Sequence, residues 1–229
     1  MAGLTTYELA DGVATISLDD GKVNAFSIAM LEAVHADLDR AEKDGAVVVI
    51  AGREGYFSAG FDLNVFRSEP ERIVEMLTLG ATLCERLLAF PRPVLVACSG
   101  HAIAAGSFLP LAADLRIGVE GPFKLGLNEV QIGLTVPLFV VELARQRLQP
   151  AAFDRAVVNA TMFDPAAALA AGFLDSVVPA DEFAARVEEG AKGLAGLDAE
   201  AHAATKLRAR APAIAALRTA IEEELAASG

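Results

Sequence analysis

Residues 94–108 read Val94-Leu95-Val96-Ala97-Cys98-Ser99-Gly100-His101-Ala102-Ile103-Ala104-Ala105-Gly106-Ser107-Phe108. The first five residues are apolar and show no polar alternation, which predicts a strand covered on both faces. The small residues that follow predict a tight loop, and after it a helix that ends near Asp114. Residues 93–113 are apolar enough to suggest a membrane span, but glycines, a histidine and a proline interrupt them. A strand, a loop and a buried helix explain the segment better.

The same layout occurs earlier, where residues 47–50 (Val-Val-Val-Ile) run into Phe57-Ser58-Ala59-Gly60-Phe61-Asp62-Leu63. Ligands of α/β sheets bind beyond the carboxyl ends of strands. Small residues also let a ligand oxygen approach main-chain N–H groups closely. Two such loops side by side would aim two donors at one oxygen and form an oxyanion hole. The alternative is that the small residues only allow tight packing of strand and helix, and spacing alone leaves both interpretations open.

The flanking sequence predicts further strands and helices. Residues 4–9 and 13–18 alternate around an Asp-Gly pair, which predicts a β-hairpin. Ser27 is a candidate N-cap for a helix over 28–41. Ser68-Glu69-Pro70-Glu71 has the spacing of a capping box and predicts a helix that runs to about Phe90. We also expect a loop over 52–61, short strands over 115–119 and 123–126, and irregular structure over 126–137.

After Pro137 the pattern is mainly helical. Asp164-Pro165 and Gly172 predict the start and the end of one helix, and residues 181–195 and 199–226 predict two more. We therefore divide the chain into an α/β core, 1–145, and a helical C-terminal region, 146–229. Apolar positions of the last helix, such as Leu217 and Ile221, predict packing on the core or on another subunit.

Composition excludes several classes of function. The 229 residues carry a formal net charge of −12, so nucleic acid is not an expected partner. Two cysteines and three scattered histidines predict neither a disulfide framework nor a metal site. The stretch Met1–Glu8 lacks the pattern of a signal peptide, and with reduced thiols this predicts a cytoplasmic protein.

One acidic residue has an unusual setting. Glu129 lies in Gly126-Leu127-Asn128-Glu129-Val130-Gln131-Ile132-Gly133-Leu134, among apolar and amide neighbours. Such surroundings raise the pKa of a carboxyl group, which suits proton transfer. The alternative is an ordinary solvated loop glutamate.

Together these segments resemble the crotonase superfamily, that is, the enoyl-CoA hydratase/isomerase family. The resemblance is carried by residues 58–63, 100–117 and 123–137 and by Ala171-Gly172-Phe173-Leu174-Asp175-Ser176-Val177-Val178-Pro179, in the family's order and spacing. It implies a fold of repeated ββα units with a helical C-terminal region that forms trimers or hexamers. It also implies an acyl-CoA thioester ligand, no other cofactor, and an oxyanion hole made by the N–H groups of Phe61 and Ala105.

The departures from the family pattern point to one reaction. Hydratases of the family carry two glutamates, and the position of one of them is Phe108 here, while Glu129 matches the other. A lone carboxylate suffices to move a double bond from C3–C4 to C2–C3. The segment around Glu129 is similar to the mitochondrial-type Δ3-Δ2-enoyl-CoA isomerases, enzymes of fatty acid metabolism, so we expect an isomerase with Glu129 as sole acid/base. The alternatives are a hydratase-like lyase and a catalytically weak acyl-CoA-binding protein.

The resemblance also implies substrate-binding positions: Lys22, Asn24, Ala25, Ala59, Gly60, Asp62, Leu63, Phe108 and Asn128. Arg53, Lys124, Lys206 and Arg208 are weaker candidates for the CoA phosphates. Apolar residues such as Phe66, Met76, Leu77, Leu138 and Phe139 either line an acyl tunnel or belong to the core. Ala104-Ala105 stands where the family usually has two glycines.

Overall fold

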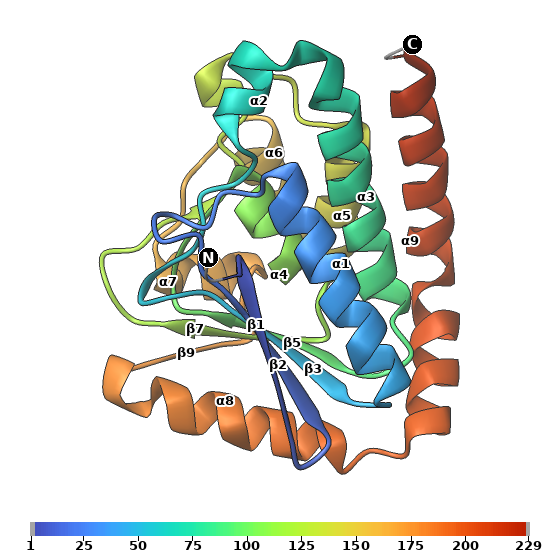
Figure 1. Ribbon diagram of the computed structural model, residues 1–229. Helices are drawn as coiled ribbons and strands as arrows, with labels where there is room; N and C mark the ends of the chain where they lie inside the picture. Colours follow the sequence, from blue (N-terminus) through green and yellow to red (C-terminus); the bar gives the residue numbers. More distant parts are fainter. Residues whose placement is uncertain (1–2, 228–229) are drawn as a thin grey trace.

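A six-stranded sheet forms the centre of the molecule (Figure 1), in a computed structural model that describes residues 3–227. Met1 and Ala2, which begin the stretch examined for a signal peptide, lie outside the described residues. The strand order is β1 (Thr5–Ala10), β2 (Val13–Leu18), β3 (Val47–Ala51), β5 (Val94–Cys98), β7 (Leu115–Val119) and β9 (Ser176–Val178). β1 and β2 form the predicted antiparallel hairpin, and the other pairs are parallel. All five residues of β5 are buried, as its apolar run predicted.

A second, three-stranded parallel sheet contains β4 (Gly55–Ser58), β6 (Gly100–Ile103) and β8 (Leu125–Gly126). The prediction of loops over 52–61 and directly after Cys98 was therefore wrong for part of each segment. β4 and β6 lie so close that a Cβ on Gly100 would stand 2.1 Å from the Gly55 carbonyl oxygen. Each of β3, β5 and β7 passes from the large sheet to a strand of the small one, and this repetition confirms the expected ββα units.

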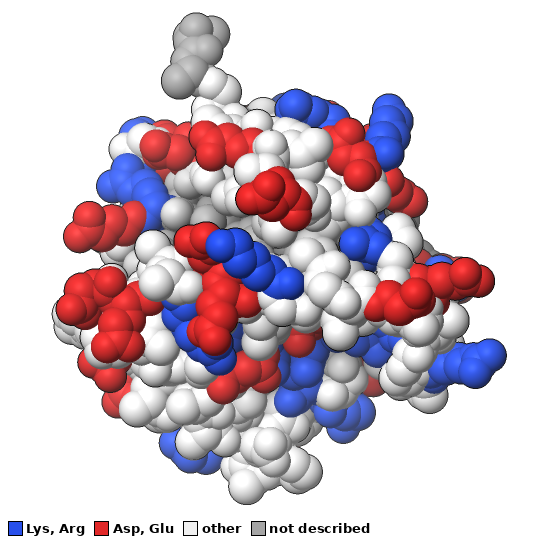
Figure 2. All heavy atoms as spheres, turned by 90° about the horizontal axis from the view of Figure 1, so that it is seen from below, with Lys and Arg blue, Asp and Glu red and all other residues white. Residues whose placement is uncertain are grey.

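Helices cover both faces of the large sheet (Figure 1). α8 (Ala180–Ala195) packs alone on one face over a small apolar cluster, and the main core lies on the other face. On the face of the molecule that includes α8, acidic and basic side chains are interspersed (Figure 2). The helices on the core side are α1 (Ile28–Lys43), α2 (Leu63–Ser68), α3 (Ile73–Ala89), α4 (Phe108–Ala112), α5 (Leu138–Arg147), α6 (Pro150–Val157), α7 (Pro165–Ala171) and α9 (Ala199–Ala227), with short 3₁₀ turns η1 (Pro70–Arg72), η2 (Ala104–Ser107) and η3 (Val130–Ile132).

Of the predicted helix boundaries, Ser27, Asp164 and Gly172 are confirmed, and Ser68 is wrong. Ser27 caps α1 by accepting a hydrogen bond from Met30 N at 3.2 Å, and Asp164 caps α7. The capping box at Ser68 was wrong, because Ser68 is the last residue of α2. Asp62 caps α2 instead, so the chain is already helical when it reaches Ser68, and α3 begins after η1 without a side-chain cap.

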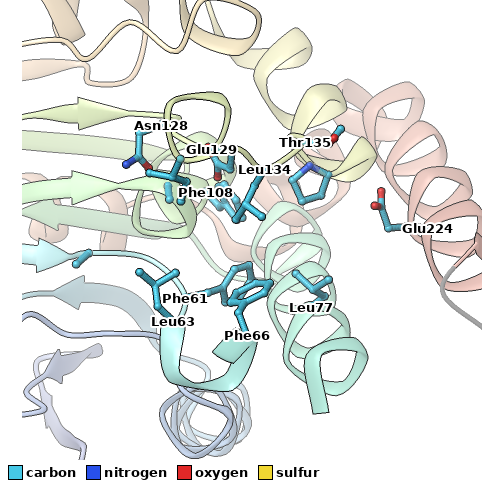
Figure 3. A pocket seen from close by; sticks show the side chains of 14 residues that line it. Phe61, Leu63, Phe66, Leu77, Phe108, Asn128, Glu129, Leu134, Thr135 and Glu224 are labelled. Atoms are coloured by element: carbon cyan, nitrogen blue, oxygen red, sulfur yellow. The ribbon is translucent and has the colours of Figure 1, made fainter. Parts of the chain in front are cut away.

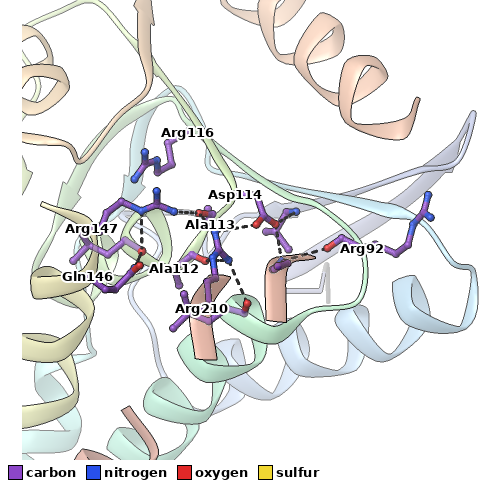
Figure 4. A network of polar contacts seen from close by, with 12 residues as sticks. Arg92, Ala112, Ala113, Asp114, Arg116, Gln146, Arg147 and Arg210 are labelled. Atoms are coloured by element: carbon purple, nitrogen blue, oxygen red, sulfur yellow. Dashed lines mark hydrogen bonds and ion pairs between the residues drawn. The ribbon is translucent and has the colours of Figure 1, made fainter. Parts of the chain in front are cut away.

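A buried polar network fastens the C-terminal helices to the end of α4 (Figure 4). Asp114 pairs with Lys206 at 2.6 Å and with Arg210 at 2.9 Å, both from α9. Arg147 of α5 donates to the carbonyl oxygen of Ala113. These cations meet the carbonyl end of α4, where positive charge is favourable. Lys206 is therefore held in an ion pair with Asp114, and its candidacy for the CoA phosphates stays a prediction.

The strand β9 belongs to the C-terminal region by sequence but pairs with β7 in the large sheet. The two regions thus share a sheet, and the boundary at residue 145 stays a prediction. Within residues 3–227, no helix combines the length and the apolar character needed to span a membrane.

Candidate active site

A cavity of about 230 Å³ opens beside the two loops that the sequence singled out (Figure 3). Its wall is mostly apolar, with a few polar groups. The lining residues are Ala59, Phe61, Leu63, Phe66, Leu77, Ala104, Phe108, Asn128, Glu129, Ile132, Leu134, Thr135, Pro137 and Glu224. An apolar pocket with a few convergent polar groups is the usual form of a small-molecule site.

The two loops are in direct contact. Gly60 has φ +93°, and a Cβ there would stand 2.8 Å from the Ile103 carbonyl oxygen and 3.1 Å from Ala105 N. Only glycine allows both the left-handed backbone and this approach. Ser58 stabilises the first loop, since its Oγ donates to the Asn24 carbonyl at 2.7 Å and accepts from Gly60 N.

The two proposed oxyanion donors are the N–H group of Phe61, which lines the cavity, and that of Ala105, which does not. Hydrogen bonds between Phe26 and the residues on either side of Phe61 hold the loop. Among the described residues, no backbone acceptor faces the Phe61 N–H. Ala105 lies in the first turn of η2, where an N–H lacks an intrahelical acceptor. Ala105 itself is buried, and its neighbour Ala104 forms the wall of the cavity.

Ala104 has φ +50°, in the left-handed region that favours glycine. A side chain there costs roughly 1 kcal/mol. Ala104 therefore holds this conformation at the expense of local strain, and it forms part of the cavity wall.

Glu129 faces the cavity from the start of η3. It is only 6% exposed, and desolvation raises its pKa from 4.5 to about 7. In the part of the chain that the structure describes, its Oε2 and the Oδ1 of neighbouring Asn128 are buried atoms without a hydrogen-bond partner. An unpaired buried acceptor is costly, so the pair marks a place for a donor from a ligand or water. The prediction that the pKa of Glu129 is raised is thus supported.

Aromatic rings keep the other side of the cavity apolar. Phe108 is 1% exposed and packs edge to face against Phe61, with ring centroids 5.9 Å apart, and against Phe139 at 5.7 Å. The Phe61 ring lies over Gly80 of α3, where a Cβ would stand 2.6 Å from its Cζ. A glycine in the middle of α3 therefore makes room for the large residue in the oxyanion loop.

A groove of about 420 Å³ adjoins this cavity. Ala59, Phe61 and Leu63 line both the cavity and the groove. Lys22, Ala25 and Asp62 also line the groove. The Asp62 carboxylate accepts from Asn64 N at 2.9 Å and so caps α2.

Asn24 lines neither space, because its side chain is fully buried and donates to the carbonyls of Leu18 and Phe57. The Asn24 side chain therefore stabilises the backbone at Leu18 and at Phe57, where the segment of the first oxyanion loop begins. Arg53, Lys124 and Arg208 also lie outside the linings of the cavity and the groove.

Of the apolar tunnel candidates, Phe66 and Leu77 line the cavity, Met76 and Phe139 belong to the core, and Leu138 is exposed. Sequence reasoning missed Thr135, Pro137 and Glu224. Glu224 lies in a charge-rich helical tail, where no local pattern distinguishes it from other glutamates.

Known proteins share the sequence pattern and the fold of this chain. The family model described as "Enoyl-CoA hydratase/isomerase" matches residues 8–227. A crystal structure of an enoyl-CoA hydratase/isomerase family protein from Pseudomonas syringae superposes with TM-score 0.95 at 49% identity, covering 97% of this chain and 96% of that one. An enoyl-CoA hydratase from Mycobacterium marinum has TM-score 0.93 at 42% identity, covering 99% and 100%.

Among curated proteins, mitochondrial enoyl-CoA delta isomerase 1 of Rattus norvegicus is 30% identical over 176 residues. The match covers 75% of this chain but 61% of the rat protein, so the chain spans about three fifths of that relative's length. The similar proteins thus include some named for hydration and some for isomerisation. With the matching family model and the shared fold of two sheets and C-terminal helices, the chain belongs to the enoyl-CoA hydratase/isomerase (crotonase) family.

Proposed function

We propose that this protein is a Δ3-Δ2-enoyl-CoA isomerase in which Glu129 is the sole acid/base. One observation carries the proposal: a single buried carboxyl group with a pKa of about 7 faces the cavity beside the two oxyanion loops. A base whose pKa lies near the working pH is suited to removing a proton and returning it.

The reaction follows from these groups. The thioester oxygen accepts hydrogen bonds from the N–H groups of Phe61 and Ala105, and the Glu129 carboxylate removes a proton from C2. The electron pair of the broken C–H bond spreads over a dienolate, whose negative charge rests on the oxygen. Each donor of an oxyanion hole contributes about 3 kcal/mol to such an intermediate. Protonated Glu129 then delivers the proton to C4, which leaves the double bond between C2 and C3.

Phe108 supports isomerisation over hydration. A hydratase needs a second carboxylate to hold the attacking water, and here a phenyl ring occupies that position between Phe61 and Phe139. One observation favours the hydratase alternative. Asn128 Oδ1 and Glu129 Oε2 are both buried acceptors without a hydrogen-bond partner among the described residues, and a water bound in the cavity could donate to either of them.

The groove supports the rest of the proposal. Coenzyme A would leave the cavity past Ala59 and Leu63 and run by Lys22 and Ala25, with Lys22 as the candidate cation for a phosphate. A cytoplasmic homotrimer or hexamer in fatty acid metabolism belongs to the same proposal. Exposed apolar side chains such as Leu197 and Leu207 in the C-terminal region are consistent with burial against another subunit.

The test is the Glu129→Gln variant with 3-hexenoyl-CoA, with formation of 2-hexenoyl-CoA followed by chromatography. We expect isomerisation to fall by at least about 10³-fold, while binding of saturated hexanoyl-CoA, measured by calorimetry, is retained. Glu120→Gln, at an exposed residue, is the matched control and should behave as the unchanged protein.

Hydration of 2-hexenoyl-CoA is measured on the same protein stock. A hydration rate equal to the isomerisation rate would favour the hydratase alternative. Acyl-CoA binding without turnover on either substrate would favour the weak binding protein. Retained isomerisation in Glu129→Gln would refute the role of that residue.

A further inference from the structure

The cavity has an acidic side chain at each end (Figure 3). Glu129 lies at one end, Glu224 lies at the other, and the apolar residues Leu77 and Leu134 lie between them. Glu224 comes from α9, about a hundred residues later in the chain. The mechanism proposed above uses Glu129 and leaves Glu224 without a role.

Glu224 occupies a position where the helix pattern predicts an apolar residue. On α9, Ile214, Leu217 and Ile221 form a buried stripe with spacings of three and then four, and Glu224 is the next member of that stripe at a spacing of three. α9 packs along α5, and the same stripe brings Glu224 to the first residue of α5. Its Oε2 accepts a hydrogen bond from Leu138 N at 2.6 Å. The N-terminus of a helix is a favourable place for a negative charge, so the carboxylate is fixed at the edge of the cavity.

The direction of the acyl chain follows from the way in which the cavity and the groove are joined. The groove assigned to coenzyme A joins the cavity at Ala59, Phe61 and Leu63. With the thioester at the oxyanion loops and C2 to C4 at Glu129, the rest of the acyl chain continues away from the groove. That path runs along Leu77 and Leu134 and ends at Glu224.

We infer that Glu224 sets the upper limit on acyl chain length. This inference rests on the proposed function, because it assumes an acyl-CoA ligand with its thioester at the oxyanion loops. An alkyl chain that reaches the carboxylate would strip water from a charged group and offer it no hydrogen bond, which is costly. Chains that stop short of Glu224 gain apolar contacts with Leu77 and Leu134 at no such expense. The protein therefore selects short and medium saturated tails over long ones.

The experiment measures binding, so that it does not depend on turnover. Butanoyl-, hexanoyl-, octanoyl- and decanoyl-CoA are titrated into the unchanged protein and into Glu224→Leu, Glu224→Gln and Glu222→Leu. Glu222 is an exposed residue on another side of α9 and serves as the matched control. Glu224→Gln keeps an acceptor for Leu138 N and removes the charge, so it reports on the limit if Glu224→Leu fails to fold.

We expect the affinity of the unchanged protein to rise with chain length and then to fall by about tenfold or more. In Glu224→Leu the fall disappears, in Glu224→Gln it shrinks, and in Glu222→Leu it remains. A terminal hydroxyl on the longest acyl chain should raise the affinity of the unchanged protein, because it can donate to the carboxylate, and it should give no such gain in Glu224→Leu.

Affinity that rises steadily to decanoyl-CoA, or equal profiles for Glu224→Leu and Glu222→Leu, would overturn the inference and leave the proposed function standing. If none of the four ligands bound, the proposed function would fall, and the inference with it.

Discussion

The burial of Glu129 has a consequence for stability that does not depend on activity. Its pKa is about 7 in the folded protein and 4.5 as the ordinary value. Because the folded state binds this proton more tightly, the free energy of unfolding falls as pH rises from about 4.5 to about 7. At 1.36 kcal/mol per pKa unit, full ionisation removes about 3 kcal/mol of stability. The Glu129→Gln variant lacks the charge and escapes this loss.

We therefore expect Glu129→Gln to be more stable than the unchanged protein by about 3 kcal/mol at pH 8.5 and by less than about 1 kcal/mol at pH 5. Urea unfolding followed by circular dichroism measures both values, with Glu120→Gln as the exposed control. A difference between the two proteins that is the same at both pH values would refute the reasoning, because it would mean that the carboxylate is solvated in the folded state. The higher stability of Glu129→Gln at pH 8.5 would also show that Glu129 is retained at a cost in stability, as is common at functional sites.

The other predictions concern the base Glu129, the cavity-wall residues Phe108 and Ala104, and the buried ion pairs of Asp114. The kcat/KM for isomerisation should rise with pH and level off above an apparent pKa of about 7, because the ionised form of Glu129 is the base; a profile flat from pH 5 to 9 would contradict this. Phe108→Ala should lower the free energy of unfolding by about 3 kcal/mol, since it leaves a cavity between two rings, and it should raise hydration relative to isomerisation in the paired assay. Ala104→Gly should raise the free energy of unfolding by about 0.5 kcal/mol in urea titrations, because relief of the left-handed backbone outweighs the added freedom of the unfolded chain. Asp114→Asn should lower it by about 3 kcal/mol by leaving Lys206 and Arg210 buried without their partner; a loss below about 1 kcal/mol would show that the network is solvated.

The sequence predicted a structural feature correctly where the residues that cause the feature lie within one short segment. The apolar runs of β3 and β5 predict buried parallel strands, because only a strand covered on both faces lacks polar alternation. Ser27 and Asp164 predict helix starts, since a cap needs only the next three residues. The apolar and amide neighbours of Glu129 likewise predicted its raised pKa. The motif order over most of the chain was enough for the family resemblance.

The small sheet shows where local reasoning ends. β4 and β6 are four residues long and fall where loops were expected, whereas β8 lies within the short strand predicted over 123–126. The strands of the small sheet form because β3, β5 and β7 lie parallel and place the segments that follow them side by side. Glycine at position 100 also permits close contact between the backbones of β4 and β6. The false capping box at Ser68 has a similar origin, since a helix begun at Asp62 was already using those residues.

The sequence by itself thus determined five of the six strands of the large sheet, all but β9, together with the acidic residue with a raised pKa and the family, because each depends on residue types at fixed short spacings. Only the tertiary structure decided which distant side chains meet. It paired Lys206 with Asp114 inside the fold and brought Glu224 from the last helix to the far end of the cavity that Glu129 enters. Contacts between residues a hundred positions apart depend on how whole helices pack, and no local pattern of charge or hydropathy contains that information.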